Sequence, residues 1–361
     1  MNRPTVYFNK NFSVTSAQIR AMREVGQFET LASHSDPSNV MLHAADHQLT
    51  EPRGLLGDAY AEWLLATCRQ HRPAVFIVGK EAAAVAPRRA DFERLGVRVV
   101  VAASRAVLRE LDHKDAFLRG WDSSILPIPA WTTFHDLATF DAAVEQLQAH
   151  PDWVPGQTRL CLKPARGIYA SGFRVLTEGR DLKSFLQGEL YQMSHAEARV
   201  MFAQAEQAGE RLPTMLLMHT LEGAERSVDC VAWEGTLAAA VVRRKPAGQG
   251  GQLIEDRPDL LEAARALAQR YRMSGVFNFQ TKDDRQRRPH MLEINARASG
   301  GLRYSMAAGI NFAQLAAELS LGLLRPDQAP RPTTGLVVAE EKSAWVVREA
   351  APSLLTGAAQ P

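Results

Sequence analysis

The most constraining feature of the chain is a strictly alternating run at residues 291–297, Met-Leu-Glu-Ile-Asn-Ala-Arg, followed by Ala-Ser-Gly-Gly. Successive side chains of a β-strand point to opposite faces, so Glu293, Asn295 and Arg297 share one face and the apolar residues between them share the other. Carboxylate and amide oxygens are ligands for hard cations such as Mg²⁺, and the planar fork of arginine suits a phosphate or a carboxylate. The run therefore predicts a strand that presents a metal and anion site.

A second strand is predicted just upstream, at residues 276–280 (Val-Phe-Asn-Phe-Gln). The polar segment 282–289 that separates the two runs suits the long loop of a hairpin. Folding this hairpin brings Gln280 beside Glu293 and Asn295. The alternative is an ordinary amphipathic hairpin with a solvated polar face.

Residues 1–105 alternate between strand and helix patterns. The apolar runs predict strands at residues 6–8, 28–32, 74–78 and 97–101, and the periodicity predicts helices at 15–25, at 57–71 and through Phe92 and Leu95. Strands separated by helices indicate a parallel sheet. No Gly-x-Gly-x-x-Gly motif follows the first strand, so nothing here indicates a dinucleotide site.

The composition is that of a globular protein, with 46% hydrophobic and 23% charged residues among 361 and a net charge of +2. We therefore expect neither nucleic acid nor a membrane as a partner. Cys68, Cys161 and Cys230 lie far apart in the sequence, which favours reduced thiols in a cytoplasmic protein. The first ten residues lack an apolar stretch, so we expect no signal peptide.

A predicted strand at 159–164 ends in Lys163-Pro164, and a loop containing Gly167, Ser171 and Gly172 follows it. An ammonium group beside exposed backbone N–H groups suits a triphosphate. The segment is not a Walker A loop, because no Gly-Lys-Ser/Thr follows. An ordinary turn that uses the two glycines is the alternative.

Together these segments resemble the ATP-grasp superfamily, in particular the carbamoyl-phosphate synthetase large-subunit branch and the carboxylate–amine ligases. The resemblance extends over residues 1–325 and is strongest at 275–301. It implies an α/β fold of the α+β ATP-grasp type, with an N-terminal parallel-sheet pre-ATP-grasp lobe followed by a two-lobed ATP-grasp domain. The expected divisions are a pre-ATP-grasp lobe at 1–105, a linker and lid lobe at 106–215, a metal and substrate lobe at 216–330, and a hairpin and tail at 331–361.

The resemblance implies that Gln280, Glu293 and Asn295 are metal ligands and that Arg297 contacts a phosphate or the substrate. Arg297 and Lys163 are the expected catalytic residues. Many relatives have an acidic residue in place of Gln280, so this site carries less negative charge. We therefore expect Mg²⁺, with Mn²⁺ as an alternative, to arrive with ATP, whose phosphates complete the coordination shell.

For the nucleotide, the resemblance implies that Lys114 contacts the α-phosphate; a solvated surface lysine is the alternative. Lys163 would bind the phosphates together with Gly167, Ser171 and Gly172 of the lid. Relatives usually have more glycine where this chain has residues 168–170, Ile-Tyr-Ala.

The segment 215–229 resembles the hinge and ribose segment of the family. Its backbone at Met218, His219 and Leu221 would read the adenine edge, although relatives often have Gln-Glu where this chain has Met-His. Glu225, with Glu222 as the alternative, would bind the ribose hydroxyls. The remaining candidates are Arg243 or Lys245 as a contact of the γ-phosphate or of an anionic substrate, and Asp229 on the cleft-facing side of the strand.

The resemblance implies a ligase that activates a small-molecule carboxylate as an acyl phosphate and couples it to a nucleophile, with an amine as the acceptor that the relatives indicate. Dimers are common among relatives, so a homodimer is compatible with it. The alternatives are a catalytically silent ATP-binding regulator, a single-unit bicarbonate or carbamate kinase of the carbamoyl-phosphate type, and an α/β binding protein without nucleotide. The long polar helical stretch predicted at 181–212 has no assigned role, and the pair His43 and His47 lacks the further ligands of a zinc site.

Overall fold

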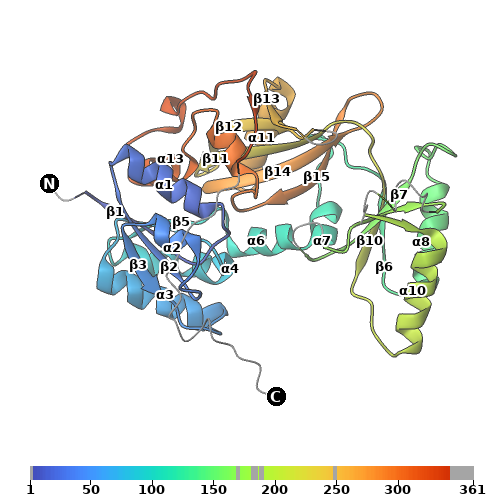
Figure 1. The fold of residues 1–361 in the computed structure, drawn as a ribbon, viewed down its shortest axis with the longest axis horizontal. Coiled ribbons are helices and arrows are strands. Elements are labelled where there is room, and N and C mark those ends of the chain that lie inside the picture. Colours follow the sequence, from blue (N-terminus) through green and yellow to red (C-terminus); the bar gives the residue numbers. More distant parts are fainter. Residues whose placement is uncertain (1–2, 168–170, 180–185, 187–190, 247–249, 342–361) are drawn as a thin grey trace, which may run out of the picture. The chain divides into compact units, whose positions relative to one another are not determined.

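The computed structural model describes residues 3–167, 171–179, 186, 191–246 and 250–341 (Figure 1). The chain separates into two compact units, each assembled from segments distant in sequence. The first unit comprises the described residues up to Leu108, Ser227–Asn278 and the described residues from Ala296; the second comprises Arg109–Arg226 and Phe279–Asn295. In this described part of the chain, no helix combines the length and apolar character needed to cross a bilayer.

The first unit contains the predicted parallel sheet. Its strands lie in the order β3 (His47–Thr50), β2 (Glu29–His34), β1 (Thr5–Phe8), β4 (Val75–Ile77) and β5 (Arg98–Val100), and every pair is parallel. The helices between them are α1 (Thr15–Val25), α2 (Val40–Ala44), α3 (Gly57–His71), α4 (Ala82–Val85) and α5 (Arg89–Glu93), with a 3₁₀ turn at Ala86–Arg88. The βαβ pattern in the sequence predicted this architecture correctly.

Alternating residues of β1 supply the cores on the two faces of this sheet. Val6 and Phe8 point to one side, where they pack in a cluster that includes Ile19 of α1 and Phe312 of α13 (Phe312–Ser320). Tyr7 points to the other side and packs with residues of α3 and with Phe76, whose ring it stacks on at 4.9 Å. Both faces are therefore covered, as expected of a parallel sheet.

The strand β3 was not predicted. Its sequence, His-Gln-Leu-Thr, follows α2 directly, and three of its four residues are exposed at the edge of the sheet. An exposed edge strand does not need the apolar run by which buried parallel strands are recognised. The histidines that frame this helix–strand junction thus lie on ordinary structural elements.

The second unit is built on a mostly antiparallel sheet in the order β6 (Trp131–Phe134), β10 (Met215–His219), β7 (Leu160–Pro164), β8 (Arg174–Thr177) and β9 (Gln192–Ser194). Two helices, α8 (Leu137–Gln148) and α10 (His195–Gln207), pack on it (Figure 1). Their shared core contains Phe134, Phe140 and Phe202, whose ring centroids are 5.0–5.4 Å apart. The helices α6 (Arg105–Asp112) and α7 (Lys114–Arg119) precede this sheet in the chain.

The stretch 181–212 is not one long helix. Its described part contains β9, which pairs in parallel with β8, and then α10 from His195. A capping box at Ser194 and Glu197 starts α10, with the Glu197 N–H donating to Ser194 Oγ at 3.0 Å. The polar composition predicts one extended helix, whereas the described part of this stretch contains a strand followed by a shorter helix.

A six-stranded sheet has the order β15 (Pro289–Asn295), β14 (Gly275–Asp283), β11 (Glu225–Trp233), β12 (Thr236–Arg244), β13 (Gln252–Glu255) and β16 (Val337–Val338). The strands β14 and β15 are neighbours in this sheet and confirm the predicted hairpin. The associated helices are α11 (Pro258–Arg270) and α12 (Leu302–Met306), and a 3₁₀ turn spans Pro326–Gln328. Of the predicted terminal hairpin, β16 pairs with β13, and residues 342–361 lie outside the described part.

Candidate functional site

The polar side chains of β15 share a face, as the alternation predicts. Asn295 Nδ2 donates a hydrogen bond to Glu293 Oε1 at 3.0 Å, and both side chains are half-buried. Gln280 is half-buried on the neighbouring strand β14. The contact uses an amide N–H and one carboxylate oxygen; the second carboxylate oxygen and the amide oxygen have the chemistry of ligands for a hard cation.

The donor set fits Mg²⁺ only as part of a metal–phosphate complex. One carboxylate and two amides supply a single negative charge, and the described residues contain no cluster of three or more acidic, histidine or cysteine side chains arranged for a metal. Magnesium binds proteins through one or two carboxylates together with substrate phosphates and water. The residues present therefore match a metal that enters with a nucleotide.

The apolar side of β15 differs from the prediction. The fully buried residues are Met291 and Ile294, three positions apart, whereas Leu292 is only half-buried. The Met291 N–H donates to the carbonyl oxygen of Pro127 at 2.8 Å, so the linker that precedes β6 covers this edge strand. The local hydrophobic periodicity of the sequence cannot predict such a contact with a distant segment.

The loop between β7 and β8 joins an antiparallel pair, in agreement with the predicted lid hairpin. Lys163 is half-buried on β7, opposite Leu216 of β10. Gly172 has a φ of 72°, and a Cβ there would lie 2.7 Å from Pro164 Cδ, so this position requires glycine. Gly167 also has a positive φ, Ser171 is exposed, and residues 168–170 lie outside the described part.

Lys114 is the first residue of α7 and contacts this loop directly. Its backbone N–H donates to the Ala165 oxygen at 2.9 Å, and its Nζ donates to the Gly167 oxygen at 2.7 Å. The structure thus brings two predicted cofactor residues, Lys114 and Gly167, into contact. In this state the ammonium group holds the lid loop.

A second lysine near Lys163 escaped the sequence analysis. The connection 282–289 was expected to be loop, but Lys282 belongs to β14. Burial raises the pKa of the Cys161 thiol to about 11, and the positive charges of Lys163 and Lys282 oppose that rise. Both ammonium groups therefore act electrostatically on the same buried thiol of β7.

The backbone of β10 is largely used within its sheet. Met218 lies opposite Trp131 on one side and Cys161 on the other, and the His219 N–H donates to Ala130 O at 2.9 Å. The imidazole of His219 is buried, with Nε2 2.9 Å from Leu147 O on α8, and burial lowers its pKa. Of the three predicted adenine contacts, only Leu221 lies beyond the last paired strand residue.

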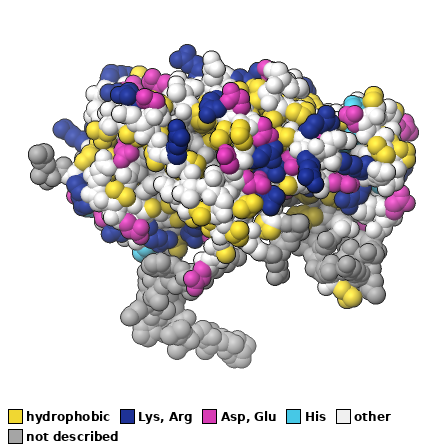
Figure 2. All heavy atoms as spheres, turned by 90° about the horizontal axis from the view of Figure 1, so that it is seen from above, with side chains coloured by type: hydrophobic (Ala, Val, Ile, Leu, Met, Phe, Trp, Pro, Cys, Tyr) yellow, Lys and Arg dark blue, Asp and Glu magenta, His cyan; other side chains and the backbone are white. Residues whose placement is uncertain are grey.

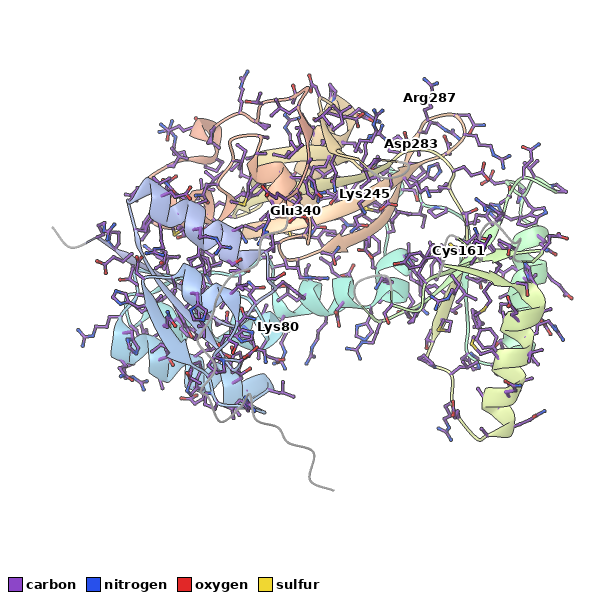
Figure 3. The ribbon with its side chains drawn as sticks, viewed as in Figure 1. Lys80, Cys161, Lys245, Asp283, Arg287 and Glu340 are labelled. Carbon is purple, nitrogen blue, oxygen red and sulfur yellow. The ribbon has the colours of Figure 1, made fainter. Side chains whose placement is uncertain are left out.

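The segment after β10 is joined to the end of β14. The Gly223 N–H donates to Asp283 O at 2.9 Å, and Arg226 Nη1 donates to Asp283 Oδ2 at 2.7 Å. Glu222 makes an ion pair with Arg285 at 3.5 Å, whereas Glu225 is half-buried at the start of β11. These contacts fix the backbone that carries the two candidate ribose ligands; Figure 3 labels Asp283.

Gly223 has no room for a side chain, because a Cβ would lie 2.5 Å from Asp283 Cβ and 2.8 Å from its carbonyl oxygen. We expect Gly223→Ala to lower the free energy of unfolding by about 1–3 kcal/mol, as overpacking typically does. Thermal unfolding compared with Gly179→Ala, where a Cβ meets nothing within 4 Å, measures the effect. Equal melting temperatures for the two variants would refute this packing argument.

Arg243 is not exposed to a ligand but forms a buried cluster, with 2% of its surface exposed. Its Nε donates to Asp229 Oδ2 at 2.8 Å, its Nη2 donates to Ser299 Oγ at 3.0 Å, and its Nη1 donates to Gln252. Ser305 Oγ adds a bond to the same Asp229 oxygen at 2.5 Å. Because all three nitrogens bind protein groups, we assign Arg243 to supporting the loop after Arg297, which leaves Lys245 as the phosphate candidate of this segment.

This cluster explains the second glycine after Arg297, Gly301, whereas a Cβ at Gly300 would meet nothing within 4 Å. A Cβ at Gly301 would lie 2.6 Å from Arg243 Nη1 and 3.0 Å from Cζ. The Asn278 side chain donates to the Arg297 carbonyl oxygen at 2.8 Å, and the Arg297 guanidinium carbon lies 5.2 Å from the centre of the Phe12 ring. The sequence held a signal for Asp229, since an acidic residue followed by the apolar run Cys-Val-Ala within a strand indicates a buried carboxylate that needs a cation.

Residues 211–344 match a family model described as an ATP-grasp in a biosynthetic pathway with the Ter operon. No significant match to a curated protein was found by sequence. Among solved structures, the fold resembles N5-carboxyaminoimidazole ribonucleotide synthetase in an ADP complex, with 12% identity, a TM-score of 0.63, and coverage of 93% of this chain and 80% of that one.

Two further structures resemble the chain at 13% identity. One is the biotin carboxylase domain of Hydrogenobacter thermophilus 2-oxoglutarate carboxylase, in complex with MgADP, ADP and bicarbonate, with a TM-score of 0.59 and coverage of 89% of this chain and 70% of that one. The other is L-amino acid ligase from Bacillus licheniformis, with a TM-score of 0.56 and coverage of 91% and 78%. Part of the chain thus matches an ATP-grasp family model, and the chain as a whole shares the fold of these structures.

Proposed function

We propose that this chain is a Mg·ATP-dependent ligase that activates a carboxylate as an acyl phosphate and couples it to a nucleophile, with an amine as the preferred acceptor. The observation that carries the proposal is the Glu293–Asn295 pair on β15 in a chain with an ATP-grasp fold. Two of the similar structures hold ADP or MgADP, and the proteins are a ribonucleotide synthetase, a biotin carboxylase domain and an amino acid ligase, which supports the reaction class.

In this proposal Glu293, Asn295 and Gln280 hold a divalent metal, which neutralises charge on the β- and γ-phosphates when bound. Lys163 and Lys282 neutralise the remaining phosphate charge, and Lys114 holds the lid loop that contains Gly167, Ser171 and Gly172. The backbone from Leu221 onward reads the adenine edge, while Glu225 binds the ribose. Arg297 orients the reacting carboxylate or phosphate with its planar fork.

The reaction needs alignment and charge neutralisation more than proton transfer. A carboxylate oxygen of the substrate attacks the γ-phosphorus, the bond from that phosphorus to the bridging oxygen breaks, and ADP leaves. The amine then attacks the carbonyl carbon of the acyl phosphate, releases phosphate and loses a proton to water. Fixed positive charges are sufficient for the first step, so the reaction does not require a dedicated general base.

We also propose a cytoplasmic location, small-molecule substrates and a homodimer as the assembly. Three free cysteines, all buried and distant from one another in the sequence, support a reducing compartment. The proposed lobe divisions at residues 105, 215 and 330 belong to the same proposal. A catalytically silent ATP-binding regulator is the second candidate, and the single carboxylate of the metal site favours it; bicarbonate-dependent ADP release would instead indicate carbamoyl-phosphate-type chemistry.

The test is ADP release with Mg·ATP across a panel of amino acids and small acids. Release that depends on an acceptor supports the ligase, whereas ATP binding without turnover for any acceptor favours the regulator. Binding itself is expected to raise the melting temperature in a manner that depends on both Mg²⁺ and ATP.

Lys163→Ala is expected to weaken ATP binding by about 10- to 100-fold, because it removes a charge-assisted contact to phosphate. Calorimetric titration with Mg·ATP measures the change. Arg199→Ala is the control, since Arg199 is an exposed cation of the same unit that pairs with Asp141 on the surface. An unchanged affinity of Lys163→Ala would remove Lys163 from the nucleotide site.

A further inference from the structure

The N-terminal sheet has a topological switch point between β1 and β4. From β1 the chain proceeds to β2 and β3 on one side, while β4 and β5 lie on the other. In open parallel sheets, ligands bind outside the carboxyl ends of the strands at such a point. Here these ends are the segments 9–14 after β1 and 78–81 after β4, and neither was assigned a function from the sequence.

The two segments are tied into one rigid floor. Asn9, which is fully buried, accepts from the Gly79 N–H at 2.6 Å and donates to Lys80 O at 3.1 Å, while the Lys80 N–H donates to Lys10 O at 2.8 Å. A Cβ at Gly79 would lie 2.6 Å from Lys10 O. Because these hydrogen bonds fix the backbones of the two segments to each other, the side chains of Lys10 and Lys80 start from fixed positions.

Two cations, Lys80 and Arg297, lie over one aromatic ring, and a third, Lys10, leaves the floor itself. Lys80 Nζ lies 4.2 Å from the centre of the Phe12 ring, and Arg297 Cζ lies 5.2 Å from the same centre. Lys10 Nζ donates to Ser35 Oγ, in the segment after β2, at 2.9 Å. Burial lowers the pKa of Lys80, the positive charges of Arg297 and Lys10 lower it further, and the negative charge of Glu81 opposes this shift, so both other cations repel Lys80. Lys80 is labelled in Figure 3.

Among the described residues, no carboxylate forms an ion pair with Lys10, Lys80 or Arg297. Two acids of this region, Glu51 and Glu81, accept hydrogen bonds from neutral donors, although the charge of Glu81 also acts on Lys80. Glu51, which is buried, accepts from the Lys10 N–H at 2.8 Å and from the hydroxyls of Ser33 and Tyr60. Glu81 accepts from the Gly57 N–H at 3.0 Å.

The visible face in Figure 2 has basic and acidic side chains interspersed, so a general excess of positive charge does not explain the cluster. Holding like charges together costs stability unless a ligand of opposite charge compensates. The Phe12 ring contributes an apolar surface between two of the cations.

We propose that the switch point is a binding site for an anionic group, carboxylate or phosphate, of a substrate that is acidic in addition to its reacting centre, with Lys10 and Lys80 as the binding residues. This inference rests on the proposed function for the statement that the bound anion belongs to a substrate. Arg297, two residues after Asn295 in the chain, is the third cation of the site. The proposal narrows the substrate class to small acids with a second anionic group.

The experiment measures binding of two simple probes, inorganic phosphate and succinate, to the full chain by calorimetry at constant ionic strength. Wild type is expected to bind at least one of them, and Lys10→Gln and Lys80→Gln are each expected to weaken that binding at least tenfold. Arg53→Gln, which removes an exposed cation of the same unit, is expected to bind like wild type. Preference for one probe tells a phosphate site from a carboxylate site.

The melting temperature separates a ligand site from a structural role. Without anion, Lys80→Gln is expected to melt at or above the wild-type temperature, because a repelling charge is removed. With a saturating concentration of the preferred probe, wild type is expected to melt higher than the variant. A variant that melts well below wild type without anion, equal affinities of Lys80→Gln and wild type, or no binding of either probe would each overturn the proposal.

The two proposals fail separately. Lys163→Ala, which is expected to lose ATP affinity, should keep the Lys80-dependent binding of the probe; loss of that binding in Lys163→Ala would place the anion in the nucleotide site and overturn the inference. If probe binding depends on Lys80 but no acid supports ADP release, the anion site stands and the ligase proposal fails. If turnover occurs equally with glutamate and glutamine and Lys80→Gln changes neither KM, the ligase stands and the anion site fails.

Discussion

Glu293→Gln is expected to reduce Mg²⁺-dependent ATP turnover by at least about 100-fold while leaving the fold intact. Removing a single preorganised electrostatic group from a reaction centre typically costs two to three orders of magnitude in rate. Here the loss is expected at the upper end, because Glu293 is the only carboxylate among the three proposed ligands. The measurement is ADP release as a function of Mg²⁺ concentration, with the melting temperature as a check on folding.

The matched control is Glu262→Gln on α11, which removes a carboxylate that forms an exposed ion pair with Arg265. It is expected to leave turnover unchanged. Glu293→Gln is isosteric and leaves the hydrogen bond from Asn295 possible after an amide rotation, so a loss of activity reports on charge at the metal rather than on packing. Wild-type turnover in the folded Glu293→Gln variant would exclude Glu293 as a ligand.

Arg243→Met is expected to destabilise the protein by about 3–5 kcal/mol, because it leaves the buried carboxylate of Asp229 without its cation. Asp229 has no exposed surface, and its Oδ1 already lacks a hydrogen-bond partner among the described residues. Urea unfolding followed by circular dichroism measures the loss. The same change removes the hydrogen bond from Arg243 to Ser299 Oγ. We therefore also expect a lower melting temperature when a ligand is bound at the loop after Arg297.

The neighbouring residue provides a control. Arg244 is exposed and pairs with Glu255 at 3.4 Å, so Arg244→Met is expected to cost less than about 1 kcal/mol. The double variant Arg243→Met with Asp229→Leu is expected to recover part of the lost stability, since no unpaired charge then remains buried. Equal stabilities of Arg243→Met and Arg244→Met would show that the buried cluster does not hold the loop.

Local periodicity was sufficient to predict the main elements of the fold. The βαβ pattern of residues 1–105 gave the parallel sheet, and the polar face of 291–297 gave a strand in which Glu293 and Asn295 are in contact. Both predictions depend on the spacing of apolar and polar residues within a few positions, which can be read from the sequence. The lid hairpin was also predictable, because a glycine-containing loop between two apolar runs favours a reversal.

The features that were missed depend on partners distant in the sequence. The strand β3 forms by pairing with the edge of β2. The linker at Pro127 covers β15, and neither local sequence predicts this contact. The sequence predicts a phosphate contact at Arg243, because its partner Asp229 lies fourteen residues earlier on a different strand. The cations at Lys10 and Lys80 drew no attention because only the sheet order brings their loops together.

The most direct test of the account is a crystal structure with Mg²⁺ and a non-hydrolysable ATP analogue. We expect a metal ion bound by the Glu293 carboxylate and the Asn295 amide oxygen at about 2.0–2.1 Å, with phosphate oxygens completing its shell. A nucleotide bound elsewhere, with the polar face of β15 in contact with water alone, would contradict it.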